Sequence, residues 1–141
     1  MGSRTSSTSP EIRPNRRSIR LPDFDYTRSG AYLITIVTAA RACLLGAVTD
    51  GEISLSSWGE IADGEWRVTP TRRPNVTLDE FIIMPNHLHA LLWLDNEASD
   101  LVTHRRFGGQ VRNSLASIVG GYKAAVTSKI RALEQTPDLI V

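Results

Sequence analysis

The chain has 141 residues, a formal net charge of +1 and 41% hydrophobic residues. This length fits one compact domain with a sizeable core and is too short for two ordinary domains. A single cysteine, Cys43, excludes an intramolecular disulfide framework and a zinc site of several cysteines, and we expect it to be a small buried side chain. No apolar run approaches the roughly 20 residues of a membrane-spanning helix, and no apolar segment follows the N-terminal arginines. We therefore expect a cytoplasmic protein with neither a membrane anchor nor a secretory signal.

The first 20 residues form a basic arm. They include Arg16, Arg17 and Arg20, have one acidic residue, Glu11, and are otherwise rich in serine, threonine and proline. Such a segment cannot bury enough apolar surface to fold alone, so we expect residues 1–20 to be disordered in isolation. Two interpretations of the arginines stay open, namely phosphate contacts and a solvated basic tail.

The next part of the chain reads as a strand, a hairpin and a helix. Residues 31–38, AYLITIVT, are rich in β-branched and aromatic side chains, which is typical of a strand. Asp50-Gly51 lies between two short apolar segments and predicts a hairpin, because a type I′ turn needs positive φ at both central residues. Ser56 or Ser57 can cap a helix that follows. Four apolar residues would share one face of that helix: Trp58, Ile61, Ala62 and Trp66.

The rest reads as two strands, a loop and a long helix. Residues 76–85 and 86–95 favour two strands that are separated at Pro85-Asn86, and the polar, glycine-containing residues 96–113 indicate a loop. Residues 114–134 carry a helical apolar stripe, formed by Leu115, Ile118, Val119, Tyr122, Val126, Ile130 and Leu133. Lys123 lies off this stripe. With Lys129 and Arg131 it forms either a solvated helix face, which we favour, or an edge that faces DNA.

This order of elements predicts an α+β fold, with an antiparallel sheet and helices on one face. The plan is similar to the ferredoxin-like, split βαβ arrangement. That arrangement has one more strand after the second helix, where this chain has only residues 135–141, QTPDLIV. We therefore expect the last strand to be missing or only begun.

Residues 84–94, MPNHLHALLWL, place two histidines inside an apolar run. Because strand side chains alternate between faces, His87 and His89 should point to one side and Leu88 and Ala90 to the other. Two imidazoles about 7 Å apart along a strand can hold one divalent cation, which can polarise a phosphoryl oxygen in phosphodiester cleavage. Spacing alone also permits a pair of exposed or hydrogen-bonded histidines on an edge strand.

Other reactive residues favour structural or solvated positions. His104 lies in the polar loop and reads as a solvated histidine. Tyr32 and Tyr122 are expected to be in the core or half-buried, and Tyr26 lies in the turn before the first strand. No tyrosine is therefore placed with obvious advantage for attack on a phosphate.

Taken together and in order, four segments resemble the REP-associated tyrosine transposases, which are bacterial members of the HUH single-tyrosine transposases (U is a hydrophobic residue). These segments are residues 16–48, 53–66, 78–94 and 114–133. MPNHLH matches the metal-binding strand of that family, so the resemblance implies that His87 and His89 are its two histidine ligands. This ordered combination is far more specific than the histidine spacing alone.

The resemblance also implies a mechanism. Family members bind single-stranded DNA, often folded as a hairpin, and hold Mg²⁺ or Mn²⁺ with the two histidines and a third polar side chain. The metal polarises the scissile phosphate, and a tyrosine hydroxyl attacks it to form a 5′-phosphotyrosine bond. The domains commonly work as dimers, so single-stranded or hairpin DNA and a second copy of the chain are the expected partners.

The sequence departs from the family after residue 133. The family continues into another strand and then into a helix that bears the nucleophilic tyrosine, and this chain ends before either. We therefore interpret residues 21–141 as an HUH transposase-like domain that keeps the histidine half of the site and lacks the catalytic tyrosine. Two alternatives stay open: a non-catalytic single-stranded DNA-binding remnant or regulator, and a small α+β metal- or ligand-binding module.

Overall fold

The structure is a computed structural model, and it describes residues 21–96 and 112–135. These residues form an α+β fold with two antiparallel sheets, which confirms the predicted fold class. The N-terminal arm of residues 1–20 and the start of the expected last strand, residues 136–141, lie outside the described residues. Within the described ranges, no helix is long and apolar enough to cross a membrane.

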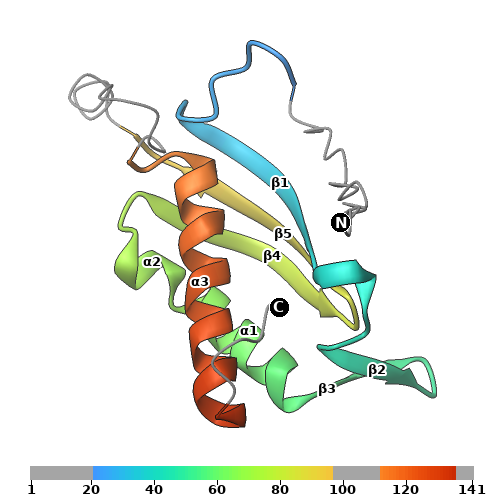
Figure 1. The fold of residues 1–141 in the computed structure, drawn as a ribbon. Coiled ribbons are helices and arrows are strands. Elements are labelled where there is room, and N and C mark those ends of the chain that lie inside the picture. The colour runs from blue at the N-terminus through green and yellow to red at the C-terminus, as the bar shows by residue number, and fades with distance from the viewer. Residues whose placement is uncertain (1–20, 97–111, 136–141) are drawn as a thin grey trace, which may run out of the picture.

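The larger sheet has three strands in the order β1-β5-β4, with all neighbours antiparallel. The strands are β1 (Gly30–Val37), β4 (Val76–Met84) and β5 (His87–Leu94). The separation of β4 from β5 at Pro85-Asn86 is as predicted. Among the described residues, β1 forms one edge of this sheet (Figure 1). This order matches three of the strands of a ferredoxin-like sheet.

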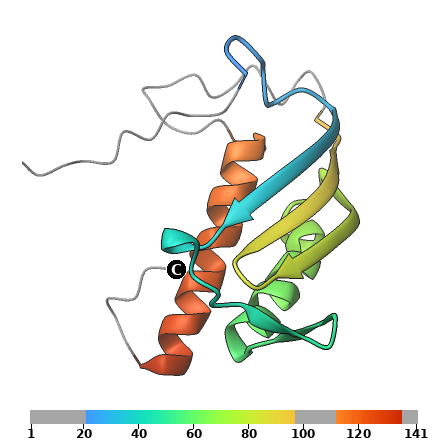
Figure 2. The same cartoon turned by 90° about the vertical axis from the view of Figure 1, so that its right-hand side faces the viewer.

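The smaller sheet is the predicted hairpin of β2 (Gly46–Thr49) and β3 (Glu52–Leu55). Asp50 and Gly51 have φ angles of 52° and 80°, so both central residues of the turn have the positive φ that a type I′ turn requires. Figures 1 and 2 show that the hairpin projects from the end of the larger sheet at which β1 ends.

The predicted helix after the hairpin is α1 (Ser57–Arg67), and the one-turn helix α2 (Thr69–Arg72) follows it. Ser56 is the N-cap of α1, because its hydroxyl accepts a hydrogen bond from the backbone N–H of Gly59 at 3.1 Å. A Cβ atom at Gly59 would lie 1.9 Å from the carbonyl oxygen of Leu45. The glycine therefore lets the start of α1 approach the backbone before β2.

The long helix α3 (Leu115–Glu134) packs with α1 on one face of the larger sheet (Figure 1). Four residues of its predicted stripe are buried in the core, namely Ile118, Tyr122, Val126 and Ile130. They meet the alternate residues Leu88, Ala90, Leu92 and Leu94 of β5 in one cluster. The prediction was wrong for Leu133, which is 54% exposed, because the last turns of α3 run past the sheet.

The prediction of a buried cysteine was also wrong. Cys43 is exposed, in the segment between β1 and β2. The buried position of this segment is taken by Leu45, whose backbone N–H donates to the carbonyl of Pro85 at 2.8 Å. Because the segment is not a regular strand or helix, no sequence periodicity indicated which of its apolar residues would face the core.

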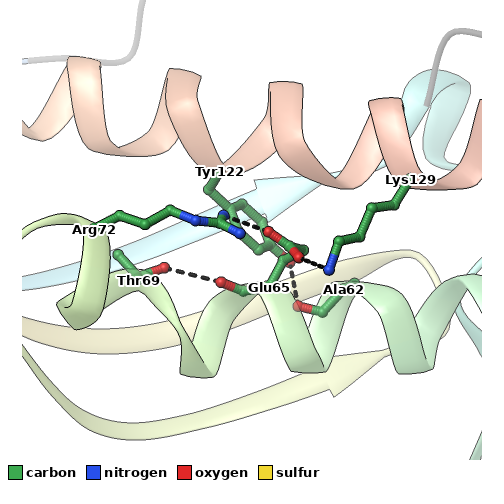
Figure 3. Close-up of polar contacts among 6 residues, drawn as sticks. All are labelled: Ala62, Glu65, Thr69, Arg72, Tyr122 and Lys129. Carbon is green, nitrogen blue, oxygen red and sulfur yellow. Dashed lines mark hydrogen bonds and ion pairs between the residues drawn. The ribbon is translucent and has the colours of Figure 1, made fainter.

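A buried carboxylate joins the three α-helices (Figure 3). Glu65 on α1 is 1% exposed, and its Oε2 accepts a hydrogen bond from Arg72 on α2 at 2.5 Å. Its Oε1 forms an ion pair with Lys129 on α3. The hydrogen bond from Arg72 is the main reason that the pKa of Glu65 lies below its ordinary value. The charge is thus compensated on both oxygens, which fits a structural role.

Candidate metal centre

The alternation of β5 places the two histidines on the face of the sheet opposite α1 and α3. Leu88 and Ala90 are buried in the core, whereas His87 is half-buried and His89 is exposed. This arrangement confirms the predicted division of side chains between the two faces. We call the surface that carries the histidines the open face, and its residues on β5 are His87, His89, Leu91 and Trp93.

The strand register extends the open face across the sheet. His89 lies between Thr35 on β1 and Ile82 on β4, and His87 lies between Val37 and Met84. Four large hydrophobic side chains of this face are exposed, namely Leu33, Val37, Ile82 and Trp93. The two imidazoles are therefore polar groups beside several exposed apolar side chains.

The two imidazole rings contact each other. Their centroids are 4.6 Å apart, and the ring planes meet at 83°. His87 Nδ1 lies 2.7 Å from Oδ1 of Asn86, and His89 Nδ1 lies 2.8 Å from Oγ1 of Thr35. Both Nδ1 atoms thus have a partner, and neither Nε2 has a hydrogen-bond partner among residues 21–96 and 112–135.

This donor set fits two ligands of a divalent cation. Histidines that bind a metal usually hydrogen-bond through the other ring nitrogen, and here the Nδ1 partners leave both Nε2 atoms for that role. The described part of the chain contains no group of three His, Cys, Asp or Glu side chains that could hold a metal. A cation at His87 and His89 would therefore need further ligands from water, substrate or other atoms.

The three tyrosines of the chain lie away from the histidine pair. Tyr122 is buried on the core face, where its hydroxyl donates to the carbonyl of Ala62 at 3.1 Å and burial raises its pKa well above the ordinary value. Tyr32 is half-buried and pairs in register with core residue Leu92. Tyr26 lies in the turn before β1, and its hydroxyl accepts a hydrogen bond from the Leu21 N–H. These positions agree with the core or half-buried placement predicted for Tyr32 and Tyr122 and with the turn predicted at Tyr26.

The predicted basic contacts are only partly described. Lys123 is exposed on α3 and borders a hollow of about 540 Å³ between α3 and the end of β1. Lys129 is not simply part of a solvated face, since it pairs with Glu65. Arg16, Arg17, Arg20 and the loop histidine His104 lie outside the described residues.

Two residues at the site were missed from the sequence, Asn86 and Thr35. Asn86 lies in the predicted break between two strands. It directly precedes His87, so the sequence MPNHLH already showed that it is next to an imidazole. Thr35 is distant in sequence and meets His89 only through the β1–β5 register. That contact has no local sequence signal.

Comparison with known proteins adds one relative. The chain is 33% identical over 132 residues to an uncharacterized protein of Haemophilus influenzae, and the alignment covers 89% of this chain and 73% of that protein. The chain belongs to the same family as that protein. Neither a protein-family model nor a solved structure matches the chain. Family membership thus assigns no activity, and any function has to be inferred from the histidine pair and its surroundings.

Proposed function

We propose that the protein is a metal-dependent, single-stranded DNA-binding protein of the HUH single-tyrosine transposase type. The observation that carries the proposal is the imidazole pair of His87 and His89, on the open face of a ferredoxin-like sheet with each Nδ1 hydrogen-bonded. The ordered resemblance of residues 16–133 to the REP-associated tyrosine transposases supports the same assignment.

In this proposal the two Nε2 atoms hold Mg²⁺ or Mn²⁺, and the cation would polarise a phosphodiester oxygen of the DNA. The exposed side chains of the open face, including Trp93, offer apolar and aromatic surface against which unpaired bases can stack. Lys123 and the arginines of the N-terminal arm supply positive charge for the DNA backbone. We also propose that the protein forms a homodimer. A molar mass in solution of twice that of the chain would support this part of the proposal.

A second candidate function is DNA binding without cleavage, and the positions of the tyrosines favour it. Tyr122 is on the opposite face of the sheet and its hydroxyl is engaged by Ala62. Attack on a phosphate at His87 and His89 needs a hydroxyl within reach of that phosphate. Within this chain, we therefore propose that the histidine site binds and orients a phosphate, and that a nucleophile for transposase chemistry would come from elsewhere.

The test combines metal and DNA titrations. Mn²⁺ binding measured by calorimetry should be lost in His87→Ala combined with His89→Ala and kept in wild type. A labelled single-stranded hairpin should bind more tightly in the presence of Mn²⁺, and this gain should also be lost in the double variant. If Mn²⁺ binds equally well to both proteins, the site is wrong. If Mn²⁺ binds to wild type but DNA does not, the protein is a metal-binding module and the DNA proposal fails.

A further inference from the structure

Asn86 connects the histidine strand to the segment that follows β1. Its side-chain Nδ2 donates to the carbonyl of Arg41 at 3.2 Å, and its Oδ1 lies 2.7 Å from His87 Nδ1. Its backbone carbonyl accepts from both the N–H and the hydroxyl of Thr38, each at 3.0 Å. One residue thus anchors the turn before β5 and contacts the imidazole of the candidate metal centre.

The partner carbonyl is presented by a strained turn. Ala40 and Arg41 have φ angles of 52° and 57°, in the left-handed region that residues with a side chain rarely adopt. The turn is held by Thr38, whose single hydroxyl proton is shared between the carbonyls of Ala42 at 2.7 Å and Asn86 at 3.0 Å. Two consecutive non-glycine residues keep this conformation only when their surroundings impose it. Its result is a carbonyl oxygen directed at the Asn86 amide.

The Arg41 carbonyl fixes which end of the Asn86 amide faces His87. A carbonyl oxygen only accepts hydrogen bonds, so the group of Asn86 beside Arg41 is the NH₂ group and the group beside His87 is the oxygen. That oxygen is also only an acceptor. His87 Nδ1 must therefore carry the proton, and in the neutral ring Nε2 then has a free lone pair.

We infer that Asn86 is a positioning residue that holds His87 in the Nδ1–H tautomer, with Nε2 directed away from the amide and available as a metal ligand. The chain of contacts runs from the strained turn at Ala40 and Arg41, through the Asn86 amide, to the imidazole. The metal consequence rests on the proposed function, whereas the tautomer does not. Thr35 differs from Asn86, because a hydroxyl can donate or accept and so leaves the tautomer of His89 open.

The experiment reads the tautomer in the metal-free protein. Long-range ¹H–¹⁵N correlation spectra in mildly alkaline buffer, where histidine is ordinarily neutral, distinguish a protonated from an unprotonated ring nitrogen. We expect protonated Nδ1 and unprotonated Nε2 for His87 in wild type. In Asn86→Ala the Nε2–H tautomer should become substantially populated. Asn75→Ala is the matched control, because Asn75 is also half-buried but bonds to Asn96 at the other end of the sheet.

Mn²⁺ affinity gives the second measurement. Loss of a hydrogen bond that orients a ligating histidine typically weakens metal binding about 10- to 100-fold, so Asn86→Ala should show this loss and Asn75→Ala should not. Asn86→Asp keeps an acceptor for Nδ1–H, so it should keep the wild-type tautomer and most of the affinity. If Asn86→Ala does not fold, Asn86→Asp is the variant to test, and an Nε2–H tautomer of His87 in it would contradict the inference.

The outcomes separate the two claims. A wild-type His87 that carries its proton on Nε2 overturns the inference, whatever metal does. An unchanged tautomer in a folded Asn86→Ala variant also overturns it. If the spectra agree with the inference but wild type binds no Mn²⁺, the positioning of His87 stands and the proposed metal function fails.

Discussion

Tyr122 and His89 lie on opposite faces of the larger sheet. Tyr122 packs edge-on against Trp66 in the core, with ring centroids 5.1 Å apart, while His89 is exposed on the open face. Between them run β1 and β5, whose residues alternate between the two surfaces. Tyr122, on the helix that packs on this sheet, is thus separated from the candidate metal ligands by the sheet itself.

The first prediction concerns that tyrosine. Tyr122→Phe removes the hydrogen bond to the Ala62 carbonyl and should lower the free energy of unfolding by about 1 kcal/mol, measured by urea denaturation. Mn²⁺ and hairpin-DNA binding should equal those of wild type. A covalent DNA adduct that survives denaturation in wild type and disappears in Tyr122→Phe would show that Tyr122 is the nucleophile after all.

The second prediction concerns the carboxylate shared by α1, α2 and α3. Glu65→Gln should lower the free energy of unfolding at neutral pH by about 1–2 kcal/mol, because Arg72 and Lys129 lose the charge with which they pair, although both cations are half-exposed and can be solvated. The matched control is Asp63→Asn on the same helix. Its ion pair with Arg67 is exposed at the arginine and screened by solvent, so we expect a clearly smaller loss than in Glu65→Gln.

The same carboxylate predicts a pH dependence. The pKa of Glu65 is lowered in the folded state, so the unfolded state binds its proton more readily. The stability from Glu65 is therefore fully present above its ordinary pKa of about 4.3 and is lost as pH falls through the lower folded pKa. The difference in unfolding free energy between wild type and Glu65→Gln should thus shrink on acidification below about pH 4. A difference that stays constant or grows there contradicts the assigned direction.

Much of the fold could be predicted because its signals are local. The Asp50-Gly51 turn is determined by two adjacent residues that tolerate positive φ, and the alternation of β5 separates a buried from an open face within one strand. Ser56 and Ser114 each cap the helix that begins at the next residue. Such features depend on residues that are only a few positions apart, so a local pattern in the sequence can predict them.

Features that join distant segments could not be predicted in this way. A charged residue such as Glu65 is ordinarily expected on the exposed face of a helix, and its burial here depends on cations from α2 and α3. In the candidate site, spacing identified His87 and His89 but not Thr35, which is 54 positions from His89. The amide of Asn86 depends on the carbonyl of Arg41, 45 positions earlier. The two histidines of the candidate site and the neighbouring Asn86 were therefore visible in the sequence, whereas the contacts with Thr35 and Arg41 were not.

The third prediction concerns a buried amide at the opposite end of the sheet. The side chain of Asn96 donates to the carbonyls of Thr27 and Asn113 at 2.8 and 3.0 Å and accepts from Asn75 at 2.7 Å. It thereby links the segment before β1, the start of β4, the end of β5 and the start of α3. Asn96→Ala should lower the free energy of unfolding by about 2–3 kcal/mol, since it leaves buried polar groups without partners. Thermal denaturation measures this loss of stability, and Asn75→Ala is the comparison for which we expect a smaller loss. Equal losses in both variants would contradict the central role of Asn96.

The last prediction concerns Lys123 and the DNA backbone. If this exposed lysine beside the end of β1 contacts one phosphate, Lys123→Ala should weaken hairpin binding and reduce the slope of log K against log salt by about 1. Arg67→Ala removes the same charge from α1, where the guanidinium pairs with Asp63 and lies 4.9 Å from the Phe81 ring centroid. That control should leave the slope unchanged, because a general change in net charge does not remove a specific counterion-release site. Hairpin binding measured by fluorescence anisotropy at several salt concentrations distinguishes a phosphate contact of Lys123 from a general effect of net charge. An equal change of slope in both variants would assign Lys123 to the solvated face of α3 rather than to a DNA contact.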